Sequence, residues 1–421
     1  MAKAAEFAWR HRMLGWILLV ALALRVAWLI HAHPDPVSDY WVYRRMGENI
    51  LDRGFIGVDG PSALLLPGYP LLLAGLMLVS RSVPWLSMVM VLLSTATCLM
   101  IYLVARRLTG REKVALVAAA ACAIHPQFVL YAPVLGTEHL FVLLMLGTIL
   151  VTLSLGPEMV TRSVAAGALA GLAMLTRGEM VFYVPVLWAV VWLGLGITDR
   201  IARMRLIALF LGAMTVVISP WLIRNSEVID PGVGLSTVSG MNFWFGHRPG
   251  GYGFTEDVPW PRGSDVVAGE IGWELGFEHI RRDPVSILES IREGTERYFS
   301  WPEYSLISST QELLPDDPFA WNRRYVPFEN SVEIALQSVS SLWLSLAAVA
   351  FLTWPAWSAS LRIVLAGFLA MGWFGHAVLF FGHPRFRYSL DILFAVLVSL
   401  TLVGLWERGR LTDMDQDRAL A

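Results

Sequence analysis

Charged side chains are scarce in this chain of 421 residues: Lys, Arg, Asp and Glu make up 16% of it, against about 25% in a typical soluble protein. Hydrophobic residues make up 56%. A chain so poor in charge is typical of a polytopic membrane protein, whose surface faces lipid rather than water. Its formal net charge of −2 gives no support for a nucleic-acid partner.

Cysteine and metal-ligand patterns are equally sparse. The two cysteines, Cys98 and Cys122, both lie inside apolar runs, so we interpret them as core residues and predict neither a disulfide nor a zinc site. His31 and His33 form a pair with no further ligand at metal spacing, and we therefore predict no dedicated metal site at this pair. No glycine fingerprint follows a strand, which excludes Rossmann-type binding of a nucleotide sugar. No internal repeat is evident.

Apolar stretches long enough for a transmembrane helix, which needs roughly 20 residues, recur along the chain. Ten segments qualify or come close: about 13–31, 85–105, 113–131, 138–155, 163–176, 180–197, 206–222, 334–353, 361–381 and 388–405. We predict an all-α polytopic membrane protein with about ten transmembrane helices and further helices at the outer membrane surface. The first segment is interpreted as an uncleaved span.

The segment 63–79 is ambiguous, because Pro67, Gly68 and Pro70 disrupt its first half. The positive-inside rule settles its place. If the chain starts inside and 63–79 does not cross, one set of basic residues falls in the cytoplasm: Arg106, Arg107, Arg111, Lys113, Arg162, Arg200, Arg203, Arg205, Arg362, Arg408 and Arg410. We therefore predict that 63–79 lies along the outer leaflet or dips into it.

This topology divides the chain into three parts. Residues 1–222 are predicted to form an N-terminal transmembrane module with a catalytic first external loop at 32–84. Residues 223–333 form an external region, and residues 334–421 form a C-terminal transmembrane module. In the external region we expect an irregular Gly- and Pro-rich stretch at 232–263. Amphipathic helices are predicted to follow at about 265–282 and 284–300.

Ionisable residues from remote parts of the chain gather at the outer ends of the predicted spans. Charged groups at membrane depth are costly and mark functional candidates by default. The set comprises Asp39 after the first span, Glu138 and His139 opening the fourth, Arg177 and Glu179 between the fifth and sixth, Arg224 ending the seventh, and His383, Arg385, Arg387 and Tyr388 opening the tenth.

Each of these residues also has a purely structural interpretation. Arg177 and Arg385 fit interfacial anchors whose charged ends reach the lipid headgroups. Glu138 fits a favourable negative charge at a helix N-terminus. Asp39 fits the N-cap of a helix over 40–51. A capping aspartate can still act as a base, so the two roles of Asp39 are compatible.

Acids and arginines at a membrane surface suit the transfer of a sugar from a lipid phosphate. A carboxylate removes the proton of an acceptor hydroxyl, whose oxygen then displaces the phosphate. Cationic groups stabilise the charge that develops on the leaving phosphate. Arginine suits this task because its planar fork binds phosphate oxygens in pairs.

Several segments, in order, resemble those of a known family. These are Asp39 with Tyr43, the stretch Pro67-Gly68-Tyr69-Pro70, the basic turn at 105–110, the glycine-rich 167–177 ending in Arg177, the stretch 220–225 with Arg224, and the pair Arg387-Tyr388. Over nearly all of 15–400 the chain resembles the polyprenyl-phosphate-sugar-dependent membrane glycosyltransferases of the C superfamily. Its nearest likeness there is to protein O-mannosyltransferase and lipid A aminoarabinose transferase relatives. His247 and Arg248 replace the two asparagines usual in one loop, so the resemblance assigns them no role.

The resemblance implies roles for the outer-face residues. Asp39 would be the general base of an inverting transfer, and Glu138 a second catalytic residue that positions a substrate. Arg177 and Arg387 would hold the lipid phosphate, with Arg385 beside them. The remaining substrate-binding candidates are Tyr43, Tyr69, His139, Arg224 and Tyr388. No cofactor is assigned; divalent-metal dependence varies among such proteins and stays open.

The resulting prediction is a multi-pass glycosyltransferase of a bacterial inner membrane with its active site facing the periplasm. Its partners would be a polyprenyl-phosphate-sugar donor, a hydroxyl acceptor on a glycan, lipid or protein, and membrane lipids. The alternatives are a lipid or polysaccharide transporter or flippase, and a non-catalytic scaffold subunit. Transporters usually show internal repeats and helices broken near the midplane, whereas this chain concentrates its charges at one end.

Overall fold

The apolar stretches of the sequence form long helices in a computed structural model, which describes residues 2–32, 36, 39–155, 159–248, 264–300, 311–312, 324–325 and 330–420. Within these ranges, seven helical stretches are long and apolar enough to cross a membrane: Trp9–Ala32, Val83–Thr109, Met159–Thr176, Arg200–Val228, Ile334–Thr353, Ala359–Leu379 and Pro384–Arg408. The predicted polytopic α-helical fold is therefore confirmed, and the count of ten spans stays a prediction.

The helices that carry these stretches are α1 (Ala2–Ala32), α4 (Val83–Thr109), α8 (Met159–Thr176), α10 (Arg200–Val228), α14 (Asn330–Ala350), α15 (Ala359–Trp373) and α16 (Tyr388–Leu420). Three further helices lie in the remaining predicted spans: α5 (Glu112–Ile124), α7 (Glu138–Leu153) and α9 (Met180–Ala189). The short elements between them include α6 (Pro126–Leu130), the π-helices η1 (Val190–Gly194) and η4 (Phe374–Leu379), and the 3-10 helices η3 (Phe351–Ala356) and η5 (Pro384–Arg387).

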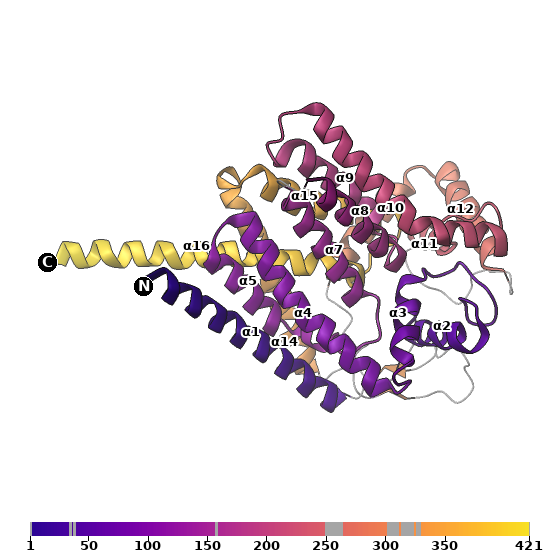
Figure 1. Cartoon of the computed structure of the whole chain (residues 1–421), viewed down its shortest axis with the longest axis horizontal. Coiled ribbons are helices and arrows are strands. Elements are labelled where there is room, and N and C mark those ends of the chain that lie inside the picture. The colour runs from indigo at the N-terminus through magenta and orange to yellow at the C-terminus, as the bar shows by residue number, and fades with distance from the viewer. Residues whose placement is uncertain are drawn as a thin grey trace.

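A second group of helices lies at one end of this bundle, away from both termini (Figure 1). It comprises α2 (Asp39–Arg53), α3 (Gly68–Met77), α11 (Val238–His247), α12 (Asp265–Arg282) and α13 (Ser286–Tyr298). Two hydrogen bonds join its early and late segments: Thr237 N–H donates to the Ala63 carbonyl at 3.0 Å, and Ser62 Oγ donates to Asp265 Oδ2 at 2.8 Å. Strands β1 (Gln311–Glu312) and β2 (Arg324–Tyr325) pair antiparallel.

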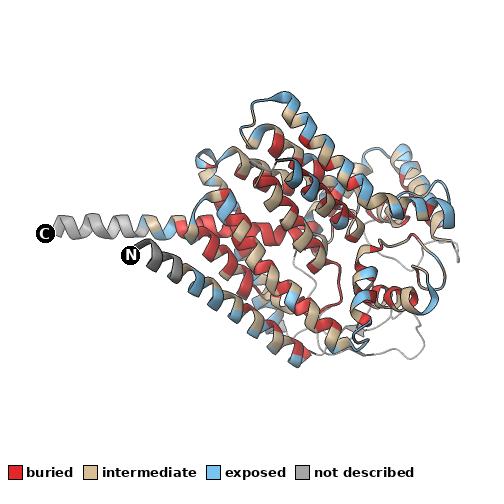
Figure 2. Cartoon of the chain, in the orientation of Figure 1, coloured by how far each residue is buried: buried red, intermediate tan, exposed pale blue. Residues whose placement is uncertain are grey.

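Helix α16 runs through the centre of the bundle, whereas α1 lies at its edge. The apolar stretch of α16 is 72% buried inside the protein, and that of α1 only 17%. Figure 2 shows the same contrast as a red segment of α16 beside a tan and blue α1. A helix that is apolar on all sides fits such a central place, because every face meets another helix. The residues just before α16 are thereby held in the middle of the bundle end.

Small residues bring α8 and α10 close together. A Cβ on Gly167 would lie 2.1 Å from the Phe210 carbonyl oxygen, and one on Gly171 would lie 3.0 Å from that of Met214. Helices in membranes commonly approach through such a pair of glycines four residues apart. This packing fixes α8, whose C-terminal end leads directly into Arg177.

The two ends of α7 identify the two ends of the bundle. Near its last residue, Arg107 Nε donates to the Leu153 carbonyl at 2.9 Å, and Arg162 donates to the carbonyl of Ser154. Glu138 is the first residue of the helix. At about 1.5 Å per residue the 16-residue helix is about 24 Å long, so Glu138 lies far from these basic residues.

Two segments outside the ten predicted spans, 63–79 and 232–263, can be compared with the sequence predictions. The α-helix within 63–79 is only ten residues long, about 15 Å, which is half of the hydrocarbon thickness. The predicted irregular stretch 232–263 is wrong over 238–247, where α11 forms. Its glycines serve close packing rather than turns: a Cβ on Gly240 would lie 1.9 Å from the Gly269 carbonyl oxygen, and one on Gly246 would lie 2.1 Å from that of Phe380.

Candidate functional site

Four of the predicted site residues meet at the end of the bundle that carries α2 and α3. Arg385 Nη1 lies 2.8 Å from Asp39 Oδ2, and its Nε lies 2.5 Å from Glu138 Oε1. Arg177 Nη1 lies 3.0 Å from the same Glu138 oxygen. The structure thus brings together a base candidate, a second acid and two arginines that are up to 346 positions apart in sequence.

The ion pairs continue behind Arg177. Its Nη2 lies 3.3 Å from Glu179 Oε2, which also lies 3.0 Å from His376 Nε2. Ser389 Oγ donates to the other Glu179 oxygen at 3.2 Å. Acids and bases alternate along this series, which we call the charge chain: Asp39, Arg385, Glu138, Arg177, Glu179 and His376.

Helix ends place the members of the charge chain. Asp39 and Glu138 are the first residues of α2 and α7, where a negative charge interacts favourably with the helix dipole. Arg177 directly follows α8, and its N–H donates to the Ala173 carbonyl at 2.8 Å. Arg385 lies in η5, where its N–H donates to His383 Nδ1 at 3.2 Å.

Burial differs sharply along the charge chain. The side chain of Glu138 is 4% exposed, Arg177 is 12% and Arg385 is 13% exposed, whereas Asp39 is 37% exposed. Asp39 is therefore the carboxylate that solvent and a substrate reach most easily. The Tyr40 ring supports Arg385 from one side, with the guanidinium carbon 4.8 Å from the ring centroid.

The protonation states of the turn at 177–179 follow from these contacts. Burial alone would raise the pKa of Glu179, but the Arg177 guanidinium and the hydrogen bond from His376 outweigh burial and lower that pKa. Burial alone would lower the pKa of Arg177, and the carboxylates of Glu179 and Glu138 raise it instead. Both groups are therefore charged at neutral pH.

Two predicted tyrosines, Tyr43 of α2 and Tyr69 of α3, meet between these helices. The rings of Tyr43 and Tyr69 meet edge to face at 5.3 Å, and both side chains are buried. Burial, with a contribution from Asp39, raises the pKa of Tyr43, so its hydroxyl stays protonated. Tyr69 OH lies 3.3 Å from Met90 Sδ. Their contact joins α2 to α3.

His139 and Tyr388 lie beside one another, in the protein interior. His139 Nε2 lies 2.9 Å from the Tyr131 carbonyl oxygen, and its ring centroid is 5.9 Å from that of Tyr388. Both residues are about 2% exposed. Their contact joins the start of α7 to the start of α16.

The other two predicted arginines have different partners. Arg387 is 1% exposed; its Nε lies 2.9 Å from Asp391 Oδ1, and its Nη1 donates to the carbonyls of Tyr298 and Ser300. Arg224 donates to the carbonyl of Ser62 at 2.9 Å and to that of Ile56 at 3.2 Å. Arg387 thus holds the end of α13, and Arg224 holds the loop between α2 and α3.

Glu179 is among the predicted outer-face residues but not among the predicted site residues, and His376 is in neither set. The signal for His376 was present, since it is an ionisable residue inside the apolar segment 361–381. Its partner is 197 positions away. Without the fold, nothing in the sequence distinguishes it from an isolated core histidine.

The two predicted catalytic acids are paired with arginine. Asp39 and Glu138 each face an arginine, and no group of three His, Cys, Asp or Glu residues capable of holding a metal occurs within the described residues.

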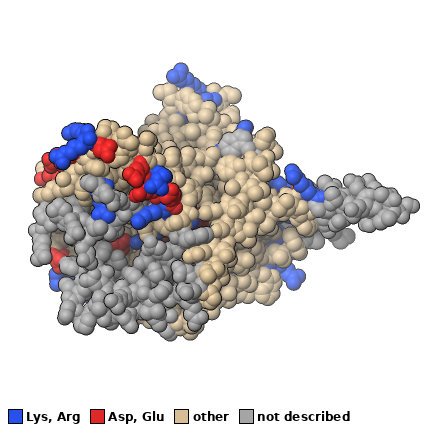
Figure 3. Space-filling view, turned by 180° about the vertical axis from the view of Figure 1, so that it is seen from behind, with Lys and Arg blue, Asp and Glu red and all other residues tan. Residues whose placement is uncertain are grey.

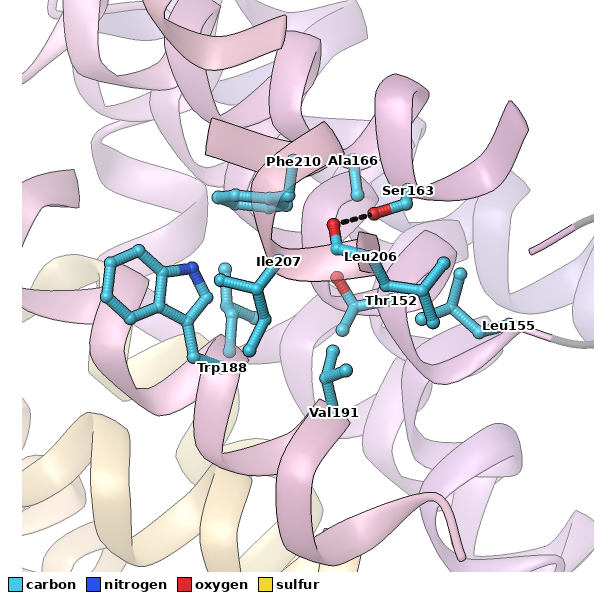
Figure 4. A pocket seen from close by; sticks show the side chains of 10 residues that line it. Thr152, Leu155, Ser163, Ala166, Trp188, Val191, Leu206, Ile207 and Phe210 are labelled. Carbon is cyan, nitrogen blue, oxygen red and sulfur yellow. Dashed lines mark hydrogen bonds between the residues drawn. The ribbon is translucent and has the colours of Figure 1, made fainter. Parts of the chain in front are cut away.

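A small apolar crevice lies elsewhere, between α7, α8, η1 and α10 (Figure 4). Figure 4 shows Trp188, Val191, Ile207 and Phe210 around it, with Ser163 Oγ donating to the Leu206 carbonyl at 2.6 Å. Its free volume of about 10 Å³ holds one water at most. Because it lies near the C-terminal end of α7, it is separate from the charge chain.

Comparison with known proteins supports the predicted resemblance. Residues 61–223 match the family model of dolichyl-phosphate-mannose-protein mannosyltransferases. No curated protein matches the chain in sequence.

Comparison with solved structures gives three matches, of which the first two have TM-scores above 0.5. The oligosaccharyltransferase AglB from Archaeoglobus fulgidus, in complex with an inhibitory peptide and a dolichol-phosphate, has a TM-score of 0.58 and 14% identity, covering 98% of this chain and 52% of that one. Its apo form has a TM-score of 0.56 and 13% identity at the same coverages. ArnT from Cupriavidus metallidurans bound to undecaprenyl phosphate has a TM-score of 0.42 and 16% identity, covering 92% and 78%.

These likenesses concern the fold. The chain spans about half the length of the oligosaccharyltransferase structures that it matches. The predicted glycosyltransferase C fold and the resemblance to that superfamily are confirmed.

Proposed function

We propose that this polytopic membrane protein, with a glycosyltransferase C fold and a mannosyltransferase family match over 61–223, transfers a sugar from a polyprenyl-phosphate donor to a hydroxyl acceptor. One observation carries the proposal: Asp39, Glu138, Arg177 and Arg385 converge in a single ion-paired cluster whose most exposed member is a carboxylate. The family match and the dolichol-phosphate in the complex of the similar oligosaccharyltransferase AglB agree with this chemistry.

In the proposed reaction Asp39 takes the proton of the acceptor hydroxyl. The acceptor oxygen forms a bond to the anomeric carbon as the bond from that carbon to the phosphate oxygen breaks, and the configuration inverts. The phosphate leaves with the electron pair as polyprenyl phosphate. Arg385 and Arg177 stabilise its charge. Glu138 lies between the two arginines and holds both guanidinium groups in place.

The resting ion pair between Arg385 and Asp39 gives the donor a second role. A phosphate that binds Arg385 competes with Asp39 for the same guanidinium. When the phosphate takes that place, the Asp39 carboxylate is released from its cation and can accept the proton of the acceptor hydroxyl. Donor binding would thus free the base that the transfer requires.

The charge distribution supports an outward-facing site in a cytoplasmic membrane. Arg107 and Arg162 lie at the opposite end of α7 from Glu138, and basic residues favour the cytoplasmic side. Figure 3 shows that on the face seen from behind, the coloured acidic residues gather at the end away from the termini, where basic residues lie among them, and that uncharged surface covers much of the rest. We infer a bacterial inner membrane with the site on the periplasmic side.

The test is sugar transfer by purified protein from a panel of undecaprenyl-phosphate-linked sugars, followed by mass spectrometry of the products. Asp39→Asn should lower the rate by about 10²- to 10⁴-fold, the usual contribution of a general base. The matched control is Asp52→Asn on the same helix, whose carboxylate pairs with Arg81 at 2.7 Å and is 47% exposed. It should leave the rate unchanged.

Binding of undecaprenyl phosphate alone tests the competition. Without the Asp39 charge, the phosphate no longer competes with a carboxylate for Arg385 Nη1. Asp39→Asn should therefore bind the lipid up to about fivefold more tightly, which corresponds to an ion pair of up to about 1 kcal/mol. Weaker binding by this variant would overturn the competition. Wild-type turnover by folded Asp39→Asn would overturn the assignment of the base.

A further inference from the structure

Glu179 joins three separate parts of the chain behind the proposed phosphate site. Its carboxylate oxygens lie 3.3 Å from Arg177 Nη2 after α8, 3.0 Å from His376 Nε2 in η4 and 3.2 Å from Ser389 Oγ in α16. Its side chain is 4% exposed. Since Glu179 is ionised and buried, every one of these contacts fixes the position of its carboxylate.

His376 is held on both sides by aromatic rings. Its ring stacks on Phe386 at 4.8 Å and 19°, and on Tyr298 at 5.9 Å and 18°. Because the carboxylate of Glu179 only accepts, Nε2 is the donor in this contact. The residue belongs to the π-helix η4. Elements of this type are rare in proteins, and those that occur are often at functional sites.

Helix α13 packs closely against η4. A Cβ on Gly294 would lie 2.4 Å from the Ala377 carbonyl oxygen, so glycine alone fits there. Trp373 Nε1 donates to Thr295 Oγ1 at 2.9 Å just before η4. These contacts hold the π-helix, and with it His376, in one place.

We propose that Glu179 and His376 are positioning residues that fix the guanidinium of Arg177 for the lipid phosphate. The inference rests on the proposed function and adds residues that no comparison assigns. Glu138 holds Nη1 and Glu179 holds Nη2, so two carboxylates define the plane of the guanidinium group. His376 and Ser389 in turn fix Glu179. An arginine fixed in this way loses less side-chain freedom when a phosphate binds.

Two substitutions of His376 separate the hydrogen bond from the ring stacking. His376→Gln keeps an N–H donor for Glu179 and removes the ring. His376→Phe keeps a ring between Phe386 and Tyr298 and removes the donor. The readout is binding of undecaprenyl phosphate to the full-length protein in nanodiscs, together with the melting temperature of each variant.

The positioning role predicts that His376→Gln binds within about twofold of the wild type. His376→Phe should bind about 5- to 10-fold more weakly, the cost of ordering one long side chain on binding. A purely structural role predicts the reverse order, because the stacked ring would matter more. Any result in which the phenylalanine variant binds as tightly as the glutamine variant overturns the proposal.

A double-mutant cycle adds a check that a structural role would not satisfy. In an Arg177→Met background, His376→Phe should change lipid-phosphate binding less than twofold, because the residue acts through Arg177. A full additional loss in that background overturns the proposal. If the wild-type protein does not bind undecaprenyl phosphate at all, the proposed function fails instead, whatever the His376 variants do.

Discussion

Replacing Glu138 by glutamine tests how strongly the site depends on its central carboxylate. The side chain is 4% exposed and lies between two guanidinium groups, at 3.0 Å from Arg177 and 2.5 Å from Arg385. The substitution keeps the shape and one acceptor oxygen, and it removes the charge. Its effect therefore reports the ion pairs rather than the packing.

The expected magnitude follows from burial and from the partners that remain. A pair of unit charges about 4 Å apart interacts by about 4 kcal/mol at an effective dielectric constant of about 20. Much of this is offset by desolvation, and breaking a buried pair costs about 3–5 kcal/mol. Arg177 keeps Glu179 and Arg385 keeps Asp39, so we expect about 3 kcal/mol, the lower end of that range.

Thermal unfolding in detergent measures this loss. With an unfolding entropy of about 2.1 cal/mol/K per residue and 421 residues, a loss of about 3 kcal/mol lowers Tm by about 3 °C. The control is Glu296→Gln on α13, which breaks a pair with Arg292 in which both side chains are more than half exposed. Such a pair contributes about 0–1 kcal/mol. Equal shifts for the two variants would refute the buried ion-pair network.

Two further predictions concern the surroundings of the site. The pKa of Glu179 is lowered in the folded state, so its contribution to the free energy of unfolding is complete above the ordinary Glu pKa of about 4.3 and is lost as pH falls through the lower folded value. The Tm of Glu179→Gln should therefore depend less on pH than that of the wild type between about pH 7 and pH 3. Identical pH profiles would contradict this. A Cβ on Gly68 would lie 2.8 Å from the Leu175 carbonyl oxygen, whereas one on Gly75, in the same helix, meets nothing within 4 Å. Gly68→Ala should therefore cost about 1–3 kcal/mol of stability, and Gly75→Ala should be neutral or stabilising by up to about 1 kcal/mol. Calorimetry of both variants checks the difference.

The helical architecture was predictable from the sequence because apolar run length governs it. Every segment predicted to span the membrane is helical in the structure, at least in part. What the sequence does not reveal is a helix such as α11, whose glycines resemble turn residues and instead allow backbone contacts with Gly269 and Phe380. Whether a glycine marks a turn or a close approach depends on a partner element that local sequence does not specify.

The arginines near α16 show the same limit for the site. The sequence predicts the same membrane depth for Arg385 and Arg387, but depth does not determine the direction in which each side chain points. They lie in the 3-10 helix η5, where residues two positions apart point to different sides because each turn takes three residues. Arg385 therefore reaches Asp39 and Glu138, and Arg387 turns inward to Asp391.

The composition of the charge chain also identifies the carboxylate that a phosphate would displace. Three carboxylates share two guanidinium groups, so a phosphate adds negative charge to a cluster with no spare arginine. One carboxylate must return toward water when it enters. Glu138 and Glu179 are each 4% exposed, and Asp39 is 37% exposed, so only Asp39 regains solvent without rearrangement of the bundle. We infer that the carboxylate most easily displaced from its arginine is the one proposed to act as the base, which couples donor binding to its activation.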